Sequence, residues 1–342
     1  MLTDSNVHET APDEYDSGTT YGDGDFAHVI NGISLDIYES LQDSNTANDP
    51  ETETDYWRYR SSTYPEYAAG TTYSTGDRVI IAATHKVYES LQSSNTGNAP
   101  ASSATYWIEV GSTNKWDPFD QKIGSQIERT GEITYEFQSG IVEGIAFFNL
   151  SAVSVDIVMT TTGEGEVYNE TIDLVSTSSI IDWYTFFFVS FRYTKNAVRL
   201  DLPPYSGATI TVSINAESDT TTAKCGEIVL GRVADCGITK YSPSYEIRDF
   251  STKGTDDFGN FEIVERAFSK LISLSIMFSK SEFESLKDFF EDYRVTPVVW
   301  IVSPNITHLE SPLSTYGFYD RLKIIVEYPT YCIGSLDLIS LI

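Results

Sequence analysis

The chain has 342 residues and a formal net charge of −28, with 22 Lys and Arg against 50 Asp and Glu. A surface this acidic repels the phosphates of DNA and RNA, so nucleic-acid binding is excluded. No apolar run approaches the roughly 20 residues that span a bilayer, which excludes membrane insertion. The length is sufficient for two or three domains.

The first residues, 1–14, are polar and show no periodic pattern. We expect a flexible or partner-docked arm there. No Lys or Arg precedes Arg58, so the positively charged start of a secretory signal is missing. Synthesis in a cytoplasm, without an export step, is therefore expected.

A thirteen-residue stretch occurs twice, at 38–50 and at 88–100. The copies read YESLQDSNTANDP and YESLQSSNTGNAP and differ at three positions. The similarity continues upstream into GTTY and downstream into a closing Tyr-Trp, so each copy is a unit of roughly fifty residues. We place module 1 at 15–62 and module 2 at 63–114. A duplicated module favours multivalent binding, because two tethered sites gain affinity without new contacts.

Each module is expected to be a small three-stranded antiparallel β structure. Short β-prone runs alternate with Gly, Asn and Pro, as in a sheet with tight turns. Fifty residues bury little surface, so aromatic rings must supply most of the core. Six rings are candidates for that core or for a ligand surface: Tyr21, Tyr38 and Trp57 in module 1, and Tyr73, Tyr88 and Trp107 in module 2.

The residue order of module 2 resembles the small chitin- and cellulose-binding modules attached to glycoside hydrolases. Their pattern is an aromatic residue, Gly-Asp-x-Val, a Tyr in the next strand, a Pro and a closing Trp. It is matched by Tyr73, Gly76, Asp77, Val79, Tyr88, Pro100 and Trp107. Module 1 departs from this order, with Phe26-Ala27 after Asp25 and a wider spacing between its tyrosines. The resemblance covers about a third of the chain and implies carbohydrate binding.

Two interpretations of the six rings remain open. The resemblance implies that exposed rings form a platform for the flat face of a sugar. Tyr21 and Tyr73 lie next to turns and are the expected exposed rings. Both tryptophans are expected in the core, whereas Tyr38 and Tyr88 suit either role.

From 115 to 240 the sequence predicts a β-sandwich. Residues 152–159 and 208–214 alternate apolar and polar side chains, as strands with one buried face do. Many such strands at short spacing, with Gly and Pro turns, are typical of two packed sheets. A jelly roll like that of galactose-binding-type domains is the expected form. The aromatic run 180–188 has the composition of a strand.

From 241 to 342 we expect a compact α+β segment, so that the whole chain is mainly β. Residues 271–278 alternate as a strand, and Ser281 with Glu284 then forms a capping box that starts a helix. The apolar residues of this helix recur at three- and four-residue intervals: Phe283, Leu286, Phe289 and Phe290. Pro297 stops the helix. Strands are expected at 298–302, at 322–328 and from 336 onward.

The sequence predicts neither a metal site nor a cofactor site. Cys225, Cys236 and Cys332 lack the spacing of a zinc site, and the four histidines do not complete one. Cys225 and Cys236 are near enough in sequence to pair, but unpaired buried thiols are expected in a chain without an export signal. No nucleophile, zinc-protease or phosphate-loop motif occurs, and no Asp/Glu pair marks a glycosidase. The chain is therefore expected not to be an enzyme.

Duplicated sugar-module-like repeats ahead of a β-sandwich and a compact end resemble bacteriophage tail proteins, which leave the cell by lysis. The resemblance implies a virion structural component of the tail, made in the host cytoplasm. Other tail proteins are its expected partners, and a homo-oligomer within the particle is its expected state. The modules either contact host-surface glycans during adsorption or act purely as architecture that docks neighbouring subunits. Both alternatives stay open.

Overall fold

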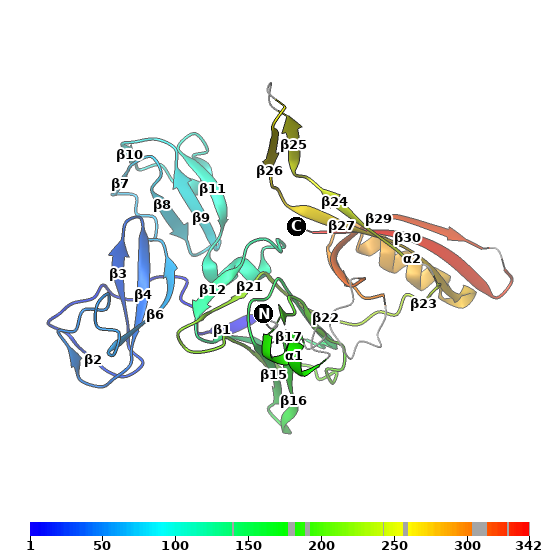
Figure 1. Ribbon diagram of the computed structural model, residues 1–342, viewed down its shortest axis with the longest axis horizontal. Helices are drawn as coiled ribbons and strands as arrows, with labels where there is room; N and C mark the ends of the chain where they lie inside the picture. Colours follow the sequence, from blue (N-terminus) through cyan, green and yellow to red (C-terminus); the bar gives the residue numbers. More distant parts are fainter. Residues whose placement is uncertain are drawn as a thin grey trace.

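The structure is a computed structural model that describes residues 1–138, 140–176, 182–188, 192–241, 243–255, 259–302, 313–326 and 328–341. The chain is mainly β, as expected, and consists of many small antiparallel sheets. Figure 1 shows the two modules on one side, the sandwich in the middle and the C-terminal sheet with its helix on the other side.

The two modules have the same arrangement of strands. Module 1 contains β2 (Thr20–Tyr21), β3 (Phe26–Asn31), β4 (Ser34–Ser40), β5 (Asn45–Thr46) and β6 (Trp57–Thr63). Module 2 contains β7 (Thr72–Tyr73), β8 (Arg78–Ile81), β9 (Lys86–Ser90), β10 (Asn95–Thr96), the 3-10 helix η1 (Pro100–Ser102) and β11 (Trp107–Ser112). A three-stranded sheet, β3-β4-β6 or β8-β9-β11, is accompanied in each by a two-stranded ribbon, β2-β5 or β7-β10. The three-stranded modules expected from the sequence are therefore present.

Two facing sheets form the sandwich. The strands are β12 (Ile127–Thr130), β13 (Ile133–Gln138), β14 (Gly144–Phe148), β15 (Ser154–Thr161), β16 (Gly165–Asp173), β17 (Val175–Ser176), β18 (Arg192–Tyr193), β19 (Ala197–Arg199), β20 (Thr209–Asn215), β21 (Thr222–Cys225) and β22 (Glu227–Gly231). One sheet has the order β1-β13-β20-β15-β16, where β1 is Leu2–Ser5, and the other has the order β19-β14-β22. The strands β12-β21 and β17-β18 form separate two-stranded ribbons. Alternate residues of both sheets meet in one core, as the period of two requires: among them are Tyr135, Phe147, Ile157, Ile210 and Val212.

The amino-terminal arm belongs to this sandwich, contrary to the expected flexible or partner-docked segment. β1 pairs antiparallel with β13 at the edge of the five-stranded sheet. Val7 follows it into the core and is 2% exposed. The segment contributes only two apolar contacts, from the half-buried Leu2 in β1 and the buried Val7 after it. Two such residues give almost no periodic pattern, so the sequence did not predict this strand.

The aromatic run expected as a strand contains a short helix instead, α1 (Trp183–Phe188). Its rings contact one another in pairs four residues apart, Trp183 with Phe187 at 6.1 Å between centroids and Tyr184 with Phe188 at 4.9 Å. Such pairs are neighbours on a helix and lie far apart along a strand. Residues 180 and 181 of the run lie outside the described residues.

The C-terminal segment combines strands and one helix, as expected of an α+β segment. Its elements are β23 (Ile238–Thr239), β24 (Ser244–Asp249), β25 (Thr252–Thr255), β26 (Phe261–Val264), β27 (Phe268–Ser279), η3 (Lys280–Glu282), α2 (Phe283–Asp292), β28 (Val298–Trp300), β29 (Thr315–Ile325) and β30 (Tyr331–Ser340). The sheet has the order β23-β27-β30-β29-β28, and β24 also pairs with β27. It has six strands rather than the four expected, and β29 and β30 begin seven and five residues earlier than expected. Leu286 and Phe290 of α2 are buried against Ile272, Leu274 and Ile276 of β27.

The capping box lies two residues before its expected position. The Ser279 side chain accepts from the Ser281 backbone N–H, and Glu282 reaches back to the Ser279 N–H. The sequence SKSEFE contains the Ser-x-x-Glu pattern twice, at 279–282 and at 281–284. The first is used because the extended strand β27 ends at Ser279.

Strand β14 joins the sandwich to the C-terminal segment. All five of its residues are buried, since Ile145 and Phe147 face the sandwich core while Ala146 and Phe148 face outward. The outward pair packs against Tyr316, whose ring lies 5.6 Å from that of Phe148. The two parts therefore share a small apolar interface of their own.

A single carboxylate holds module 2 against the amino-terminal arm. Both oxygens of Glu9 lie near His85 Nδ1, at 2.9 and 3.1 Å. Thr113 Oγ1 donates to Glu9 Oε1 at 3.0 Å, and Trp116 Nε1 donates to Oε2 at 3.0 Å. Trp116 lies in η2 (Asn114–Phe119), the junction between module 2 and the sandwich, and stacks on His85 at 3.8 Å.

We expect Glu9→Ala to lower the free energy of unfolding by about 1–3 kcal/mol, because three partly buried groups lose their shared partner. Scanning calorimetry measures the loss. Small-angle scattering should also show a larger radius of gyration as module 2 separates from the arm. Glu51→Ala, at an exposed position of module 1, is the matched control. A loss of stability equal to that of the control would contradict this role for Glu9.

Candidate carbohydrate sites in the two modules

In each module a tryptophan and two tyrosines form a cluster in which each ring contacts the other two. The Trp57 ring centroid lies 4.9 Å from that of Tyr21 and 5.8 Å from that of Tyr15, with both contacts close to edge-on. Tyr15 and Tyr21 stack at 5.8 Å. The same arrangement recurs in module 2 with Trp107, Tyr73 and Tyr67. These ring clusters are the cores of modules too small to have any other.

Burial decides the role of four of the six candidate rings. Trp57 and Trp107 are 1% and 2% exposed, as expected of core residues. Tyr21 and Tyr73, the rings expected to be exposed, are 9% and 6% exposed, so that expectation is wrong. A residue next to a turn is exposed only if the turn does not pack against the sheet. Here the ribbons β2-β5 and β7-β10 place each tyrosine ring against the tryptophan of its module.

The polar tips of these rings are hydrogen-bonded within the module. The Asp16 backbone N–H donates to Tyr21 Oη at 2.9 Å, and Trp57 Nε1 donates to the Asn48 carbonyl at 2.8 Å. Module 2 repeats both bonds, from Ala68 N to Tyr73 Oη at 2.8 Å and from Trp107 Nε1 to the Asn98 carbonyl at 2.9 Å. Buried polar groups are normally satisfied in this way, so the rings are fixed as structural elements.

The remaining two candidates differ between the modules. Tyr88 is 9% exposed and belongs to the ring cluster of module 2. Tyr38 is partly exposed and lies edge-on to Tyr59 at 5.8 Å. Burial raises the pKa of Tyr38 to about 12, with the neighbouring Asp36 adding to the rise. Of the six candidate residues, Tyr38 alone is not buried.

The polar positions of the repeated stretch hold its loop together, a role that sequence reasoning missed. Asn45 is 1% exposed and donates to Ser40 Oγ at 3.0 Å, and Asn48 donates to Asn45 Oδ1 at 2.8 Å. Ser90, Asn95 and Asn98 form the same bonds in module 2. The sequence contained one indication of this role, because the serine and both asparagines are identical in the two copies. A role in sugar binding or in the aromatic core does not explain why these polar residues are kept.

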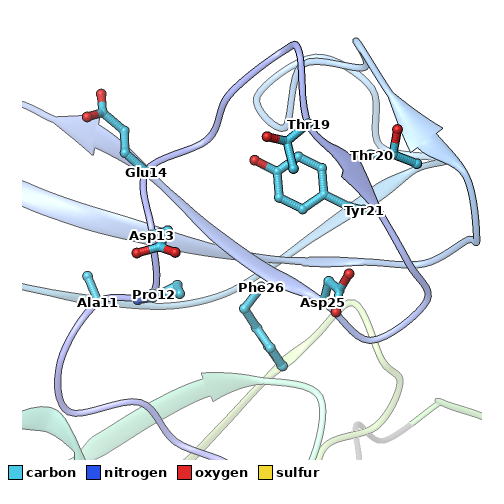
Figure 2. Close-up of a pocket in the computed structure, with 9 residues that line it drawn as sticks. All are labelled: Ala11, Pro12, Asp13, Glu14, Thr19, Thr20, Tyr21, Asp25 and Phe26. Carbon is cyan, nitrogen blue, oxygen red and sulfur yellow. The ribbon is translucent and has the colours of Figure 1, made fainter.

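Module 1 has a shallow hollow of about 550 Å³ beside Tyr21. Figure 2 shows the segment 11–14 on one side of it and Thr19 to Tyr21 on the other. Its lining is Ala11, Pro12, Asp13, Glu14, Thr19, Thr20, Tyr21, Asp25 and Phe26. Carboxylates and hydroxyls beside an aromatic ring are the groups that hydrogen-bond sugar hydroxyls and contact a pyranose face.

The corresponding surface of module 2 has different chemistry. Counting from the shared Gly-Asp turn, Arg78 stands where module 1 has Phe26. Its guanidinium pairs with Glu89 at 2.9 Å and donates to Tyr64 Oη at 3.1 Å. An ion pair therefore replaces the aromatic wall. The hollow beside Tyr21 lies in module 1, the copy that departs more from the sugar-module pattern.

Other kinds of site find little support among the described residues. No group of three or more His, Cys, Asp or Glu side chains there is placed to hold a metal ion. All three cysteines are free, and Cys225 and Cys332 are buried, as expected of unpaired thiols. No helix in this part of the chain is long and apolar enough to cross a bilayer. No protein-family model, curated protein or solved structure matches the chain.

Proposed function

We propose that this chain is an architectural subunit of a bacteriophage tail, in which the two modules and the sandwich form a jointed support for neighbouring subunits. The observation that carries the proposal is large apolar side chains left exposed outside the modules. Phe261, Trp183 and Phe188 are 81%, 78% and 73% exposed. Aromatic residues are enriched in contacts between protein chains, so exposed rings on two separate elements suit a subunit with several neighbours.

The buried module rings support the architectural alternative over the adhesive one. With Trp57, Trp107, Tyr21 and Tyr73 in module cores, the expected flat sugar platform is not available on either copy. What remains on the surface of module 1 is acidic, since the first 57 residues hold 14 Asp and Glu and no Lys or Arg. Such a surface keeps unrelated anionic chains apart and suits docking to a basic neighbour.

The proposal is tested on particles of the phage that encodes the chain. Mass spectrometry of gradient-purified tails should detect its peptides at a stoichiometry fixed relative to the other tail proteins. Deleting its gene should give particles with incomplete or missing tails in negative-stain micrographs. Intact tails that lack the chain would refute the proposal.

A second function, glycan contact at the hollow beside Tyr21, is favoured by the lining of that hollow. A single shallow sugar site of this kind typically binds near millimolar, or about −4 kcal/mol. Repetition of the chain by the symmetry of a tail raises the avidity on the order of 10²–10⁴ if the geometry allows simultaneous contacts. Weak individual sites are therefore compatible with adsorption.

We expect Asp13→Asn with Glu14→Gln to weaken glycan binding about tenfold or more, because both exposed carboxylates accept hydrogen bonds from sugar hydroxyls. A glycan array followed by NMR titration measures the change. Glu66→Gln, at the matching position of module 2, is the control and should bind as the wild type does. Equal titrations for all three proteins would remove the glycan function.

A further inference from the structure

Five charged side chains, here called the ion cluster, meet where module 1 touches the sandwich. They are Glu39 of β4, Arg58 and Arg60 of β6, Arg129 of β12, and Asp219 of the loop between β20 and β21. Asp219 Oδ2 accepts from Arg58 Nη1 at 2.6 Å, and its Oδ1 accepts from Arg60 Nη1. Arg60 Nε donates to Glu39 Oε2 at 2.6 Å, and Arg129 Nη2 lies 3.6 Å from the same oxygen. A continuous series of ion pairs therefore joins the module to the sandwich.

The cluster has a buried side and an exposed side. Arg60 and Arg129 are only 8% and 6% exposed. Arg60 comes this close because residue 131 is a glycine: a Cβ on Gly131 would lie 2.7 Å from both Arg60 Nη1 and Asp219 Oδ1. The side chains of Arg58 and Asp219 are 24% and 54% exposed. Water and salt ions therefore reach the cluster at Asp219.

The contact between module 1 and the sandwich depends on these charges. Among the described residues, the apolar cluster around Trp57 and the apolar core of the sandwich have no residue in common. Two further contacts of the module involve the amino-terminal arm that leads into it. The His8 ring lies 4.4 Å from that of Phe26, and Thr63 Oγ1 donates to the Glu9 carbonyl at 2.7 Å. Interfaces within a chain that are neither large nor apolar permit relative motion of the parts.

The closed arrangement gains little free energy from its ion pairs. Three guanidinium groups are held together by two carboxylates, and burial lowers the pKa of Arg129, with the nearby Arg60 lowering it further. Removing such charges from water offsets much of their attraction. If the module moves away as a unit, all five side chains return to water and that cost is recovered. Separation of the two parts is therefore less costly than unfolding either of them.

Module 2 lacks this cluster. Counting from the shared tryptophans Trp57 and Trp107, Ile108 and Val110 stand where module 1 has its two arginines. Both are largely exposed, and Glu89, the counterpart of Glu39, pairs with an arginine of its own module. The same module fold therefore forms without these arginines. Their role in module 1 is docking rather than folding.

We propose that the ion cluster is a latch that closes module 1 onto the sandwich and releases it without unfolding either part. Its exposed pair, Arg58 with Asp219, is the point at which salt ions weaken the latch. The buried pair, Arg60 with Glu39, sets the position of the closed module. This device is a property of the isolated chain, so it goes beyond the proposed function and does not depend on it.

Pulsed electron paramagnetic resonance on the full chain tests the latch. Spin labels are attached to Thr52→Cys in module 1 and Gly163→Cys in the sandwich, both exposed positions, with the half-buried Cys236 replaced by serine. The wild type should give one narrow distribution of distances. Asp219→Ala leaves an excess of buried positive charge and should shift the equilibrium toward longer, broader distances by about tenfold or more. Its circular dichroism spectrum should match that of the wild type, because both parts stay folded.

A second variant removes the latch from the module side. Arg58→Ile with Arg60→Val introduces the residues that module 2 carries at these positions, so module 1 should fold and separate as in Asp219→Ala. Glu128→Ala is the matched control, because Glu128 also lies on β12 but pairs with Lys224 within the sandwich. The control should keep the narrow distribution of the wild type.

Salt tests whether the latch is releasable. Raising the salt concentration from about 0.1 M to about 1 M shortens the screening length from about 10 Å to about 3 Å. The wild type should then populate the longer distances, whereas Asp219→Ala, already open, should change little. A narrow distribution in both latch variants, or broadening in Glu128→Ala to the same degree, overturns the latch. A wild type that stays closed in high salt overturns its release. None of these results affects the test of the architectural function, which is made on purified tails.

Discussion

Trp107→Ala is expected to lower the free energy of unfolding of module 2 by about 3–5 kcal/mol, the usual cost of removing a buried tryptophan. Trp107 is 2% exposed, touches Tyr67 and Tyr73 and fixes the loop at Asn98. A unit of roughly fifty residues has little stability beyond that amount. Module 2 should therefore unfold while the sandwich remains folded.

Calorimetry and limited proteolysis check this expectation. The variant should show a separate low-temperature transition, with cleavage confined to residues 63–114. Ile108→Ala, on the same strand but 51% exposed, should change stability by less than about 0.5 kcal/mol. The result also distinguishes a structural role of Trp107 from a role in ligand binding, because replacing a tryptophan on an exposed binding platform would not unfold the module. A variant as stable as the wild type would show that Trp107 is not the core of its module.

Parts of the fold could be predicted from the sequence where a pattern was repeated or where several signals agreed. The repeat of 38–50 at 88–100 fixed the existence of two alike modules, and turn residues between β-prone runs fixed their type. The helix α2 was found because a cap, a three- and four-residue apolar spacing and a closing proline all agree. Independent signals that agree leave few alternative structures.

The exposure of individual rings could not be predicted from the sequence. Tyr21 and Tyr73 have mostly polar neighbours in the sequence. Their burial depends on the ribbons β2-β5 and β7-β10, in which Tyr21 pairs with Asn45, 24 positions away, and Tyr73 with Asn95, 22 positions away. The backbone N–H groups that donate to the hydroxyls of Tyr21 and Tyr73 are also brought to these rings only by the folded turns. The sequence shows which residue types a module contains, whereas the side of the sheet on which a ring lies depends on register.

The interface between the sandwich and the C-terminal segment contains a carboxyl group that lacks a counter-charge. Glu227 is 3% exposed, and its Oε2 has no hydrogen-bond partner among the described residues. Burial raises its pKa to about 8 and nearby Asp120 adds to the rise, while hydrogen bonds from Tyr316 and the Gln121 backbone partly oppose it. The group is therefore largely protonated at neutral pH, which avoids a bare buried charge.

The stability of the chain should consequently fall as the pH rises. The folded pKa of Glu227 lies above the ordinary value of 4.5, so its contribution is complete below about pH 4.5 and is lost as the pH rises through about 8. A pKa change of this size corresponds to on the order of 3–5 kcal/mol. Burial also raises the pKa of Asp117 to about 7, which steepens the same decline.

Glu227→Gln isolates the effect of that one group. The amide keeps the shape of the protonated acid and cannot ionise, so variant and wild type should have equal free energies of unfolding at pH 4. By pH 9 the variant should be more stable by several kcal/mol. Urea titrations across this range measure the difference, and Glu246→Gln, exposed on β24, is the control that should follow the wild type. Parallel curves for wild type and Glu227→Gln would mean that the carboxyl is hydrated and that the interface opens to water.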